Sequence, residues 1–422
     1  MLKHLFKILW NQRRQNGWIF AELSLVFFAL WLICDLFIVR IYTYHQPLGY
    51  NVENCWRLSF GNYPSTAPEY VSDTTITKGK AMLQIMDRMR QVPQVESVCV
   101  AFYSSPYSFG NSWTSVLPCS ADSTRFTDKN FHRYVVSLDY FDVFRVKDKS
   151  GMRINTGRNS QQLHDGILVT PELEHEFFGG LSAVRRSVKL PNETNDIKIA
   201  AVTNSIRPDD FKKPEAALIQ LMNDKDIIRQ SDEYGYSPNE LEVTVRMKSN
   251  MTQDEMNEFI AQGNGFSAGN LYVNGASSWL DQRDNILRDS FQRMTVFSLI
   301  AIFTLLNVFF GITGTFWLRI EQRRAETGLR LALGSTHRHI GWLFTSEGWL
   351  LLTSVLPLAL VVIFNFCYME LPDTNQMDMS AWRFILGFLI TFVLMGTMIG
   401  LGSWIPARRA MKLQPAEALH YE

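Results

Sequence analysis

Four long apolar stretches lie near the two ends of the chain, and a more polar region separates the first stretch from the second. A helix needs about 20 apolar residues, at about 1.5 Å of rise each, to cross a bilayer. Tryptophan and tyrosine residues flank the stretches, as amphipathic rings do at the lipid headgroups. The pattern predicts transmembrane helices at residues 17–41, 294–318, 346–368 and 382–405.

The basic residues indicate how these helices are oriented. Lys and Arg gather before the first stretch, between the second and third, and after the fourth. Such clusters mark the cytoplasmic side, so we expect residues 319–345 and 406–422 there. The loop 369–381 carries three acidic residues and no basic one. We therefore expect this loop and the large region 42–290 on the outer side.

The first residues of the chain form a separate element. Leu2, Leu5, Phe6 and Leu9 repeat at helical spacing, with basic residues on other faces. This predicts an amphipathic helix over residues 1–16 on the inner membrane surface. A frayed basic leader is the alternative. The following stretch lacks a small-residue cleavage site, which favours an uncleaved anchor over a signal peptide.

The outer region contains the same order of strand, helix and strand twice. Trp56, Leu58 and Phe60 alternate as in a strand, and a helix after Thr77 leads to a second strand ending at Phe102. Later, the strand that begins at Leu241 precedes a helix with capping-box spacing and a closing strand, NLYV. Two such units predict a ferredoxin-like split βαβ sheet from about residues 50–104 and 238–276.

Between these halves, residues 105–237 must form an insertion with strands of its own. Candidates are RYVVSL, GILVT and a hairpin within SVKLPNETNDIKIAAV. After the sheet, the pattern turns helical at residue 278 and contains no proline or glycine before the second span. We expect a stalk helix over residues 278–293 that either continues into that span or breaks at the membrane surface. The fold class is thus an α-helical membrane protein with four transmembrane helices and a large α+β extracytoplasmic domain.

Charge and cysteine content add little. Lys plus Arg equals Asp plus Glu at 41 each, so the net charge gives no reason to expect nucleic acid as a partner. Three of the five cysteines lie in the outer region, so at least one of them is unpaired there. Cys55 and Cys99 belong to strands that a third strand separates, too far apart for a disulfide. A Cys99–Cys119 disulfide and free thiols both stay open.

Catalytic chemistry is not indicated. The glycines between residues 328 and 334 have the wrong spacing for a phosphate-binding P-loop, and the segment has no lysine. His175 lacks the second histidine that a zinc-binding helix needs, so we interpret it as solvated surface. Glu22 and Asp35 lie in the first span about 220° apart around a helix, so they do not share a face. The sequence predicts no catalytic residue and no metal site.

The cytoplasmic segments are the most specific part of the sequence. The second span is followed by RIEQRRAETGLRLALGSTHRHI, and the chain closes with WIPARRAMKLQPAEAL. Both resemble the FtsX-like permease superfamily of ABC transporters, most closely its MacB-like branch. The first motif rests on Arg323, Glu326, Gly328, Arg330 and Gly334, and the tail motif on Pro406, Arg409, Leu413 and Pro415. Thr327 and Leu331 depart from the family pattern.

The resemblance implies a function and partners. It implies a permease in a bacterial inner membrane, with its large domain in the periplasm, that works as a homodimer or heterodimer. A separate cytoplasmic ABC ATPase would bind ATP and Mg²⁺, so the chain itself would need no cofactor and would not be an enzyme. Motif residues 323–334 would dock this ATPase, and its motion would reach the periplasmic domain to drive efflux of amphiphiles, drugs or peptides. A periplasmic adaptor and an outer-membrane channel would complete the path.

Two alternatives stay open at this stage. Division-type members of the superfamily transmit signals to wall hydrolases without transport, and other members extract lipoproteins. The size of the outer region favours export, but the sequence does not identify the substrate. In the fourth span, Gly396 and Gly400 have the small-xxx-small spacing that permits close helix packing. We expect this pair to pack against another helix of the same chain.

Overall fold

The computed structural model describes residues 13–72, 75–118, 129–154, 163–191, 195–263, 266–322 and 324–410. These residues form two compact units, a helical unit (Met1–Tyr44 and Ser290–Glu422) and an α/β unit (His45–Asp289). The predicted helix over residues 1–16 lies largely outside the described residues.

Ten helices are described in the two units. Their bounds are α2 Arg13–Tyr44, α3 Lys78–Arg90, α4 Tyr140–Val143, α6 Pro171–Phe178, α7 Asp224–Asp232, α8 Gln253–Gln262, α9 Trp279–Gln322, α10 Arg324–Ala332, α11 His337–Tyr368 and α12 Ala381–Ala410. The strands are β1 Cys55–Asn62, β2 Val95–Cys99, β3 Ala101–Phe102, β4 Trp113–Ser115, β5 Leu117–Pro118, β6 Asn130–Ser137, β7 Gly166–Val169, β8 Ser187–Lys189, β9 Ile197–Val202, β10 Ala217–Met222, β11 Thr244–Met247, β12 Ser267–Ala268 and β13 Leu271–Ser278.

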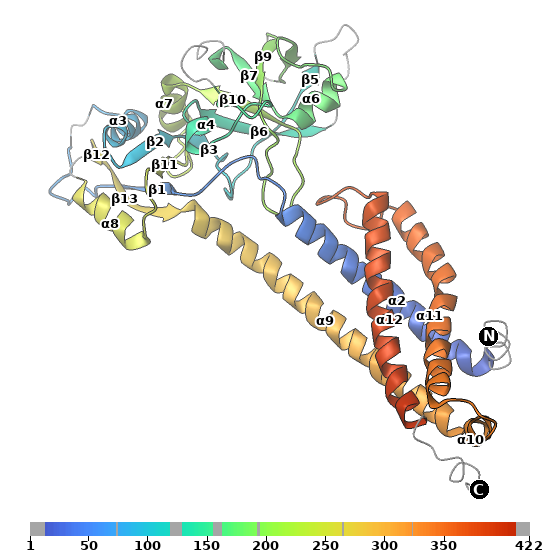
Figure 1. Ribbon diagram of the computed structural model, residues 1–422. Coiled ribbons are helices and arrows are strands. Elements are labelled where there is room, and N and C mark those ends of the chain that lie inside the picture. Colours follow the sequence, from blue (N-terminus) through green and yellow to red (C-terminus); the bar gives the residue numbers. More distant parts are fainter. Residues whose placement is uncertain are drawn as a thin grey trace. The chain divides into compact units, whose positions relative to one another are not determined.

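The first sheet of the α/β unit has the order β12-β13-β1-β11-β2. The four strands other than β12 come from β1-α3-β2 and β11-α8-β13, which confirms the predicted split βαβ sheet (Figure 1). The alternating residues Trp56, Leu58 and Phe60 of β1 face a buried core with the methionine-rich side of α3. The expected capping box of α8 is present between Thr252 and Glu255. Thr77 precedes α3 as expected, but its side chain makes no capping hydrogen bond.

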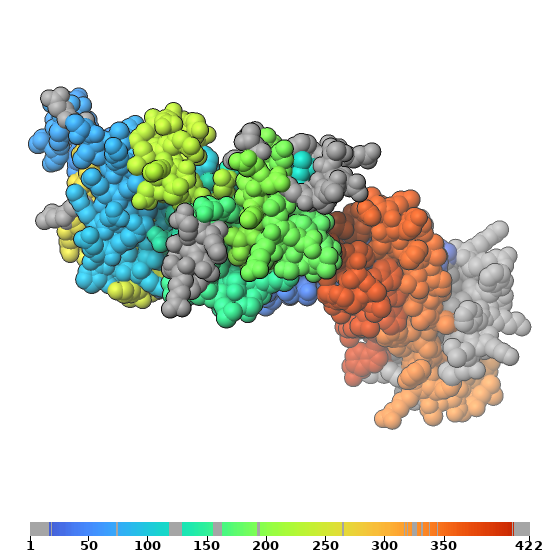
Figure 2. All heavy atoms as spheres, turned by 90° about the horizontal axis from the view of Figure 1, so that it is seen from above, coloured from blue at the N-terminus to red at the C-terminus, as the bar shows by residue number. Residues whose placement is uncertain are grey.

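The second sheet, whose strands other than β3 lie in the predicted insertion, has the order β3-β6-β10-β7-β9-β8-β5, with β4 also paired to β6. Its central strand β10 is parallel to β6 and antiparallel to β7, and β8 and β9 form the expected antiparallel pair. Ala217 and Ile219 of β10 face one core and Leu218 faces another, so side chains cover both faces of the sheet. Helix α7, which follows β10, packs against α3, and their surfaces adjoin in Figure 2.

One strand prediction was wrong in detail. The alternation through Val98, Val100 and Phe102 predicted a single strand, but the chain leaves the first sheet after Cys99. Residues Ala101 and Phe102 form β3, which pairs with β6 of the second sheet. Alternation reports burial on one face and carries no signal for the neighbouring strand, so it could not reveal this change of sheet.

Among the residues that the structure describes, four helices are long and apolar enough to cross a membrane. Their bounds are Ile19–Tyr44, Trp279–Gln322, Arg338–Tyr368 and Ala381–Pro406. Helices α2, α11 and α12 pack side by side around a core that includes Phe27 and Leu352 (Figure 1). Helix α9 is unbroken over 44 residues, about 66 Å at 1.5 Å per residue, so the first of the two alternatives for the stalk holds.

Candidate functional site

The predicted coupling motif lies on a short helix. Residues 324–332 form α10, and Arg323 lies outside the described residues. Gly328 is buried in this helix, whereas Leu329 and Leu333 beside it are exposed. Gly334 ends the helix with a left-handed φ of 96°, and the Ser335 amide donates to the Arg330 carbonyl. This is a Schellman-type cap, which glycine favours because it has no Cβ. The motif thus presents a small helix with an apolar exposed edge.

The tail motif and the glycine pair belong to α12. Pro406 and Arg409 lie inside this helix, which continues to Ala410, while Leu413 and Pro415 lie outside the described residues. A Cβ added at Gly396 would come within 2.5 Å of the Trp349 indole of α11, whereas one at Gly400 would keep 3.8 Å. Gly396 therefore permits close packing of α12 on α11 within one chain.

A buried ion pair joins α2 to α12. Arg383 donates to both carboxylate oxygens of Asp35, each at 2.7 Å, and the two side chains are 1% and 8% exposed. The same guanidinium donates to the Met377 carbonyl at 2.6 Å, which holds the loop before α12. The hydrogen bonds that the Arg383 guanidinium donates offset the free-energy cost of removing two charges from water. Glu22 is exposed and does not join it.

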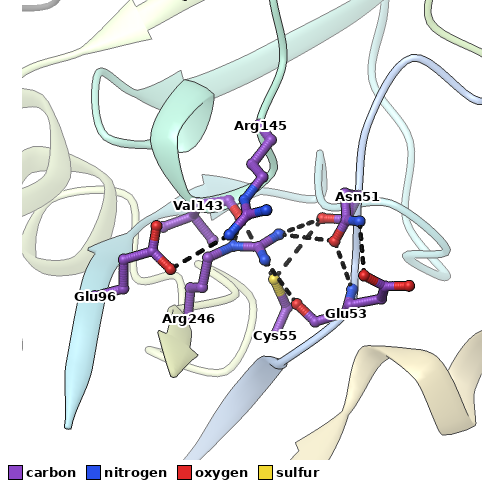
Figure 3. Close-up of polar contacts among 7 residues, drawn as sticks. All are labelled: Asn51, Glu53, Cys55, Glu96, Val143, Arg145 and Arg246. Atoms are coloured by element: carbon purple, nitrogen blue, oxygen red, sulfur yellow. Dashed lines mark hydrogen bonds and ion pairs between the residues drawn. The ribbon is translucent and has the colours of Figure 1, made fainter. Parts of the chain in front are cut away.

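In the α/β unit, a buried arginine holds the segment that follows α2. Arg246 of β11 is 1% exposed and donates to the carbonyls of Asn51, Glu53 and Val143 (Figure 3). Asn51 and Glu53 precede β1, and Val143 belongs to α4 of the insertion. One side chain therefore ties the entering segment to both parts of the α/β unit.

A second buried arginine holds the same segment further upstream. Arg207 is 1% exposed and donates to the carbonyls of Gln46, Asp210 and Lys212, between 2.6 and 2.8 Å. Its own amide donates to the Leu48 carbonyl. We call residues 45–54 the entry segment. Both arginines fix its backbone to the α/β unit.

The first turns of α9 are held in a similar way. Trp279 is 1% exposed, and its indole donates to Thr244 Oγ1 at 2.9 Å. One turn later, Arg283 forms a bidentate pair with buried Asp210, which also accepts from the Tyr107 hydroxyl at 2.6 Å. Asp210 follows Arg207 by three residues in one loop. One polar network, formed by Arg207, Asp210 and Arg283, thus supports both the entry segment and the start of α9.

Burial determines the electrostatics of this network. Burial lowers the pKa of Arg207 and of Arg246, and the carbonyls that accept from the two guanidinium groups compensate the removal of their charge from water. Burial also raises the pKa of Cys55 to about 12, which keeps it a thiol. Cys55 and Cys99 are free, and Cys119 lies outside the described residues. His175 is exposed, and no group of metal-ligating side chains occurs in the part of the chain that the structure describes.

Sequence reasoning missed these arginines. Arg246 stands in a strand whose other residues alternate between apolar and polar, and a single charge there is typical of an exposed face. The sequence held no signal for its burial, because only the structure shows that this strand, with Val245 and Met247 on either side of Arg246, is buried on both faces. Arg383 did carry a signal, since it follows the loop and stands inside the fourth apolar stretch.

Comparison with known proteins identifies the C-terminal part of the chain. Residues 298–415 match the family described as FtsX-like permease C-terminal. This part is an FtsX-like permease domain. It includes α10 and most of the tail motif, which confirms the predicted resemblance. With the four long apolar helices, it makes the chain a multi-pass membrane protein.

Relatives of the chain include ATP-binding/permease proteins. The chain is 26% identical over 185 residues to a Pseudomonas syringae pv. syringae protein named "Probable syringafactin export ATP-binding/permease protein SyfD", covering 42% of this chain and 27% of that protein. It is also 26% identical over 125 residues to the macrolide export ATP-binding/permease protein MacB of Campylobacter jejuni, covering 29% and 19%. The matched part thus spans about a fifth to a quarter of the length of these relatives.

Solved structures resemble the chain more weakly. The periplasmic region of MacB from Actinobacillus actinomycetemcomitans is 12% identical with a TM-score of 0.31, covering 57% of this chain and 94% of that one. The extracellular domain of YknZ, a noncanonic ABC-type transporter from Gram-positive bacteria, is 11% identical with a TM-score of 0.29, covering 51% and 98%.

Proposed function

We propose that the chain is the permease subunit of an ABC-type export complex and transmits ATP-driven motion to its α/β unit. The observation that carries this proposal is helix α9. It begins at Trp279, inside the core of the α/β unit, and ends at Gln322, two residues before the coupling helix α10. A continuous helix transmits displacement along its axis, whereas a kink absorbs it.

The surrounding complex follows from the same reasoning. The basic segments favour α10 in the cytoplasm of a bacterial cell, the helices in the inner membrane and the α/β unit in the periplasm. A partner ABC ATPase would bind ATP and Mg²⁺ and contact α10, and a second permease protomer would complete the membrane part. The relatives' names, which mention syringafactin export and macrolide export, support amphiphilic or drug-like cargo. We further propose a periplasmic adaptor and an outer-membrane channel as partners.

The ATPase contact can be tested on α10. We expect the double variant Glu326→Ala, Gly328→Leu to abolish co-purification of ATPase activity with the tagged chain, because a bulky residue at the buried Gly328 displaces the helix. His339→Ala, at an exposed position beyond the motif, is the control. Undiminished ATPase activity with the double variant would place the docking site elsewhere.

The transmission step is tested at Arg288, which is exposed on α9 within the α/β unit. Proline there removes a backbone donor and clashes with the preceding turn at about 3 kcal/mol, whereas Arg288→Ala keeps the helix continuous. The measurement is hydrogen exchange in the α/β unit of the complex with the ATPase. One sample contains ADP, and the other is trapped with ATP and vanadate. We expect the nucleotide-dependent difference in Arg288→Ala but not in Arg288→Pro. A difference that persists in the proline variant would refute transmission through α9.

A further inference from the structure

The α/β unit contains a cavity of about 190 Å³ beside the polar network. A single water needs only about 10–15 Å³ of such space, so the cavity has room for a small molecule. Tyrosine rings make up much of its wall, including Tyr50 of the entry segment, Tyr107 and Tyr134. Ile286 of α9 also lines it. The cavity therefore touches both connections of the α/β unit.

One wall carries a histidine whose polar atoms have no partner. His132 of β6 stacks on Trp113 at 5.1 Å between ring centroids and lies 4.4 Å from the Tyr134 ring. Both of its ring nitrogens are buried and make no hydrogen bond. Burial and the nearby Lys212 ammonium lower its pKa to about 4, so the ring is neutral near pH 7. A neutral imidazole offers one donor and one acceptor.

The charged residues of the cavity wall balance one another. They are two cations and two carboxylates: Arg207, Lys212, Asp209 and Glu215. Arg207 is occupied by three backbone carbonyls, and Asp209 accepts from the Phe211 and Lys212 amides and lies 3.8 Å from the Lys212 ammonium. The wall thus has no net charge with which to select an ionic ligand.

We propose that this cavity binds a small neutral molecule that places hydroxyl or amide groups against His132 and an apolar face against the aromatic rings, as a neutral sugar ring does. Unpaired buried polar atoms are costly, so a ligand whose hydroxyl or amide group pairs with one of the His132 ring nitrogens gains what the empty site lacks. Trp113 is 49% exposed and Phe109 83% exposed at the rim, which leaves an approach from solvent. A bound ligand would contact both the entry segment, through Tyr50, and α9, through Ile286.

The test uses N-acetylglucosamine, which is neutral and carries both hydroxyl and amide groups. The full chain is placed in lipid nanodiscs, since maltoside detergents carry sugars of their own, and binding is measured by saturation-transfer NMR. Glucosamine and glucuronate provide a cationic and an anionic comparison. No ATPase is present, so the outcome is independent of the proposed transport function.

We expect saturable binding of N-acetylglucosamine that His132→Phe weakens by about fivefold or more through the loss of a hydrogen bond to the imidazole. His132→Asn keeps a donor and an acceptor and should retain part of the affinity. His175→Phe makes the same change at an exposed position of the insertion and should bind normally. Three results would overturn the proposal: no saturable binding by the folded wild type, equal binding by His132→Phe, or stronger binding of either charged sugar.

Discussion

Replacing Arg246 by alanine tests whether the entry segment is held as the structure indicates. The change removes a guanidinium that is 1% exposed and leaves buried carbonyls of Asn51, Glu53 and Val143 without their donor. Each unpaired buried group costs about 1–3 kcal/mol, part of which relaxation and water recover. We therefore expect a loss of about 3–5 kcal/mol, a large part of the roughly 5–15 kcal/mol that stabilises a folded domain.

The assay is thermal unfolding of the full chain in detergent, followed by intrinsic fluorescence. For a unit of this length, 1 kcal/mol shifts Tm by about 2–4 °C, so Arg246→Ala should lower it by about 6–20 °C. Arg145→Ala is the matched control, because Arg145 is 55% exposed and only pairs with Glu96 at 3.6 Å. Such a surface pair contributes about 0–1 kcal/mol. Equal shifts for the two variants would refute the reasoning.

Three further predictions concern other parts of the chain. The pKa of His132 is lowered to about 4 from 6.5, so the unfolded state binds its proton first. As pH falls from 6.5 to 4, the wild type should lose up to about 3 kcal/mol of stability that a His132→Phe variant keeps, as pH-dependent unfolding would measure. Gly396→Ala should cost about 1–3 kcal/mol by overpacking against the α11 indole, whereas Gly400→Ala, whose Cβ has room, should be nearly neutral in thermal unfolding. Asp35→Asn leaves the buried Arg383 charge uncompensated and should lower the free energy of unfolding by about 3–5 kcal/mol. Replacing Asp35 by leucine and Arg383 by methionine together should restore most of this loss. An unchanged melting temperature for the single variant would contradict this prediction.

The sequence was sufficient for the two βαβ units of the first sheet and for the long helices, but it did not predict β10 and α7 of the insertion. Helical spacing in α3 and the capping box of α8 are local signals, and they predicted two βαβ units whose pairing the structure confirms. The four apolar stretches likewise determined the long helices, because length and hydropathy alone decide whether a helix suits a bilayer. Motif residues on α10 and α12 led to the family.

The buried polar contacts of Arg246 and Arg383 could not be predicted in this way. Arg246 and Val143 are 103 residues apart, and Arg383 and Asp35 are 348 apart. Such pairs depend on how distant segments meet, and a single arginine in a strand or span carries no periodic signal. The cavity at His132 has the same origin, since its walls come from the entry segment, the insertion and α9.

The pairing of β1 with β13 has a mechanical consequence. Trp56, near the start of β1, lies opposite Ser278, at the end of β13, so the two ends of the α/β unit emerge from the same end of one antiparallel pair. A force that pulls these ends apart breaks the hydrogen bonds between β1 and β13 one after another from that end. A force that moves both ends in the same direction does not stretch these hydrogen bonds. The two ends can therefore move together without breaking hydrogen bonds of this pair. Their separation is opposed first by Arg207 and Arg246, which hold the entry segment before β1.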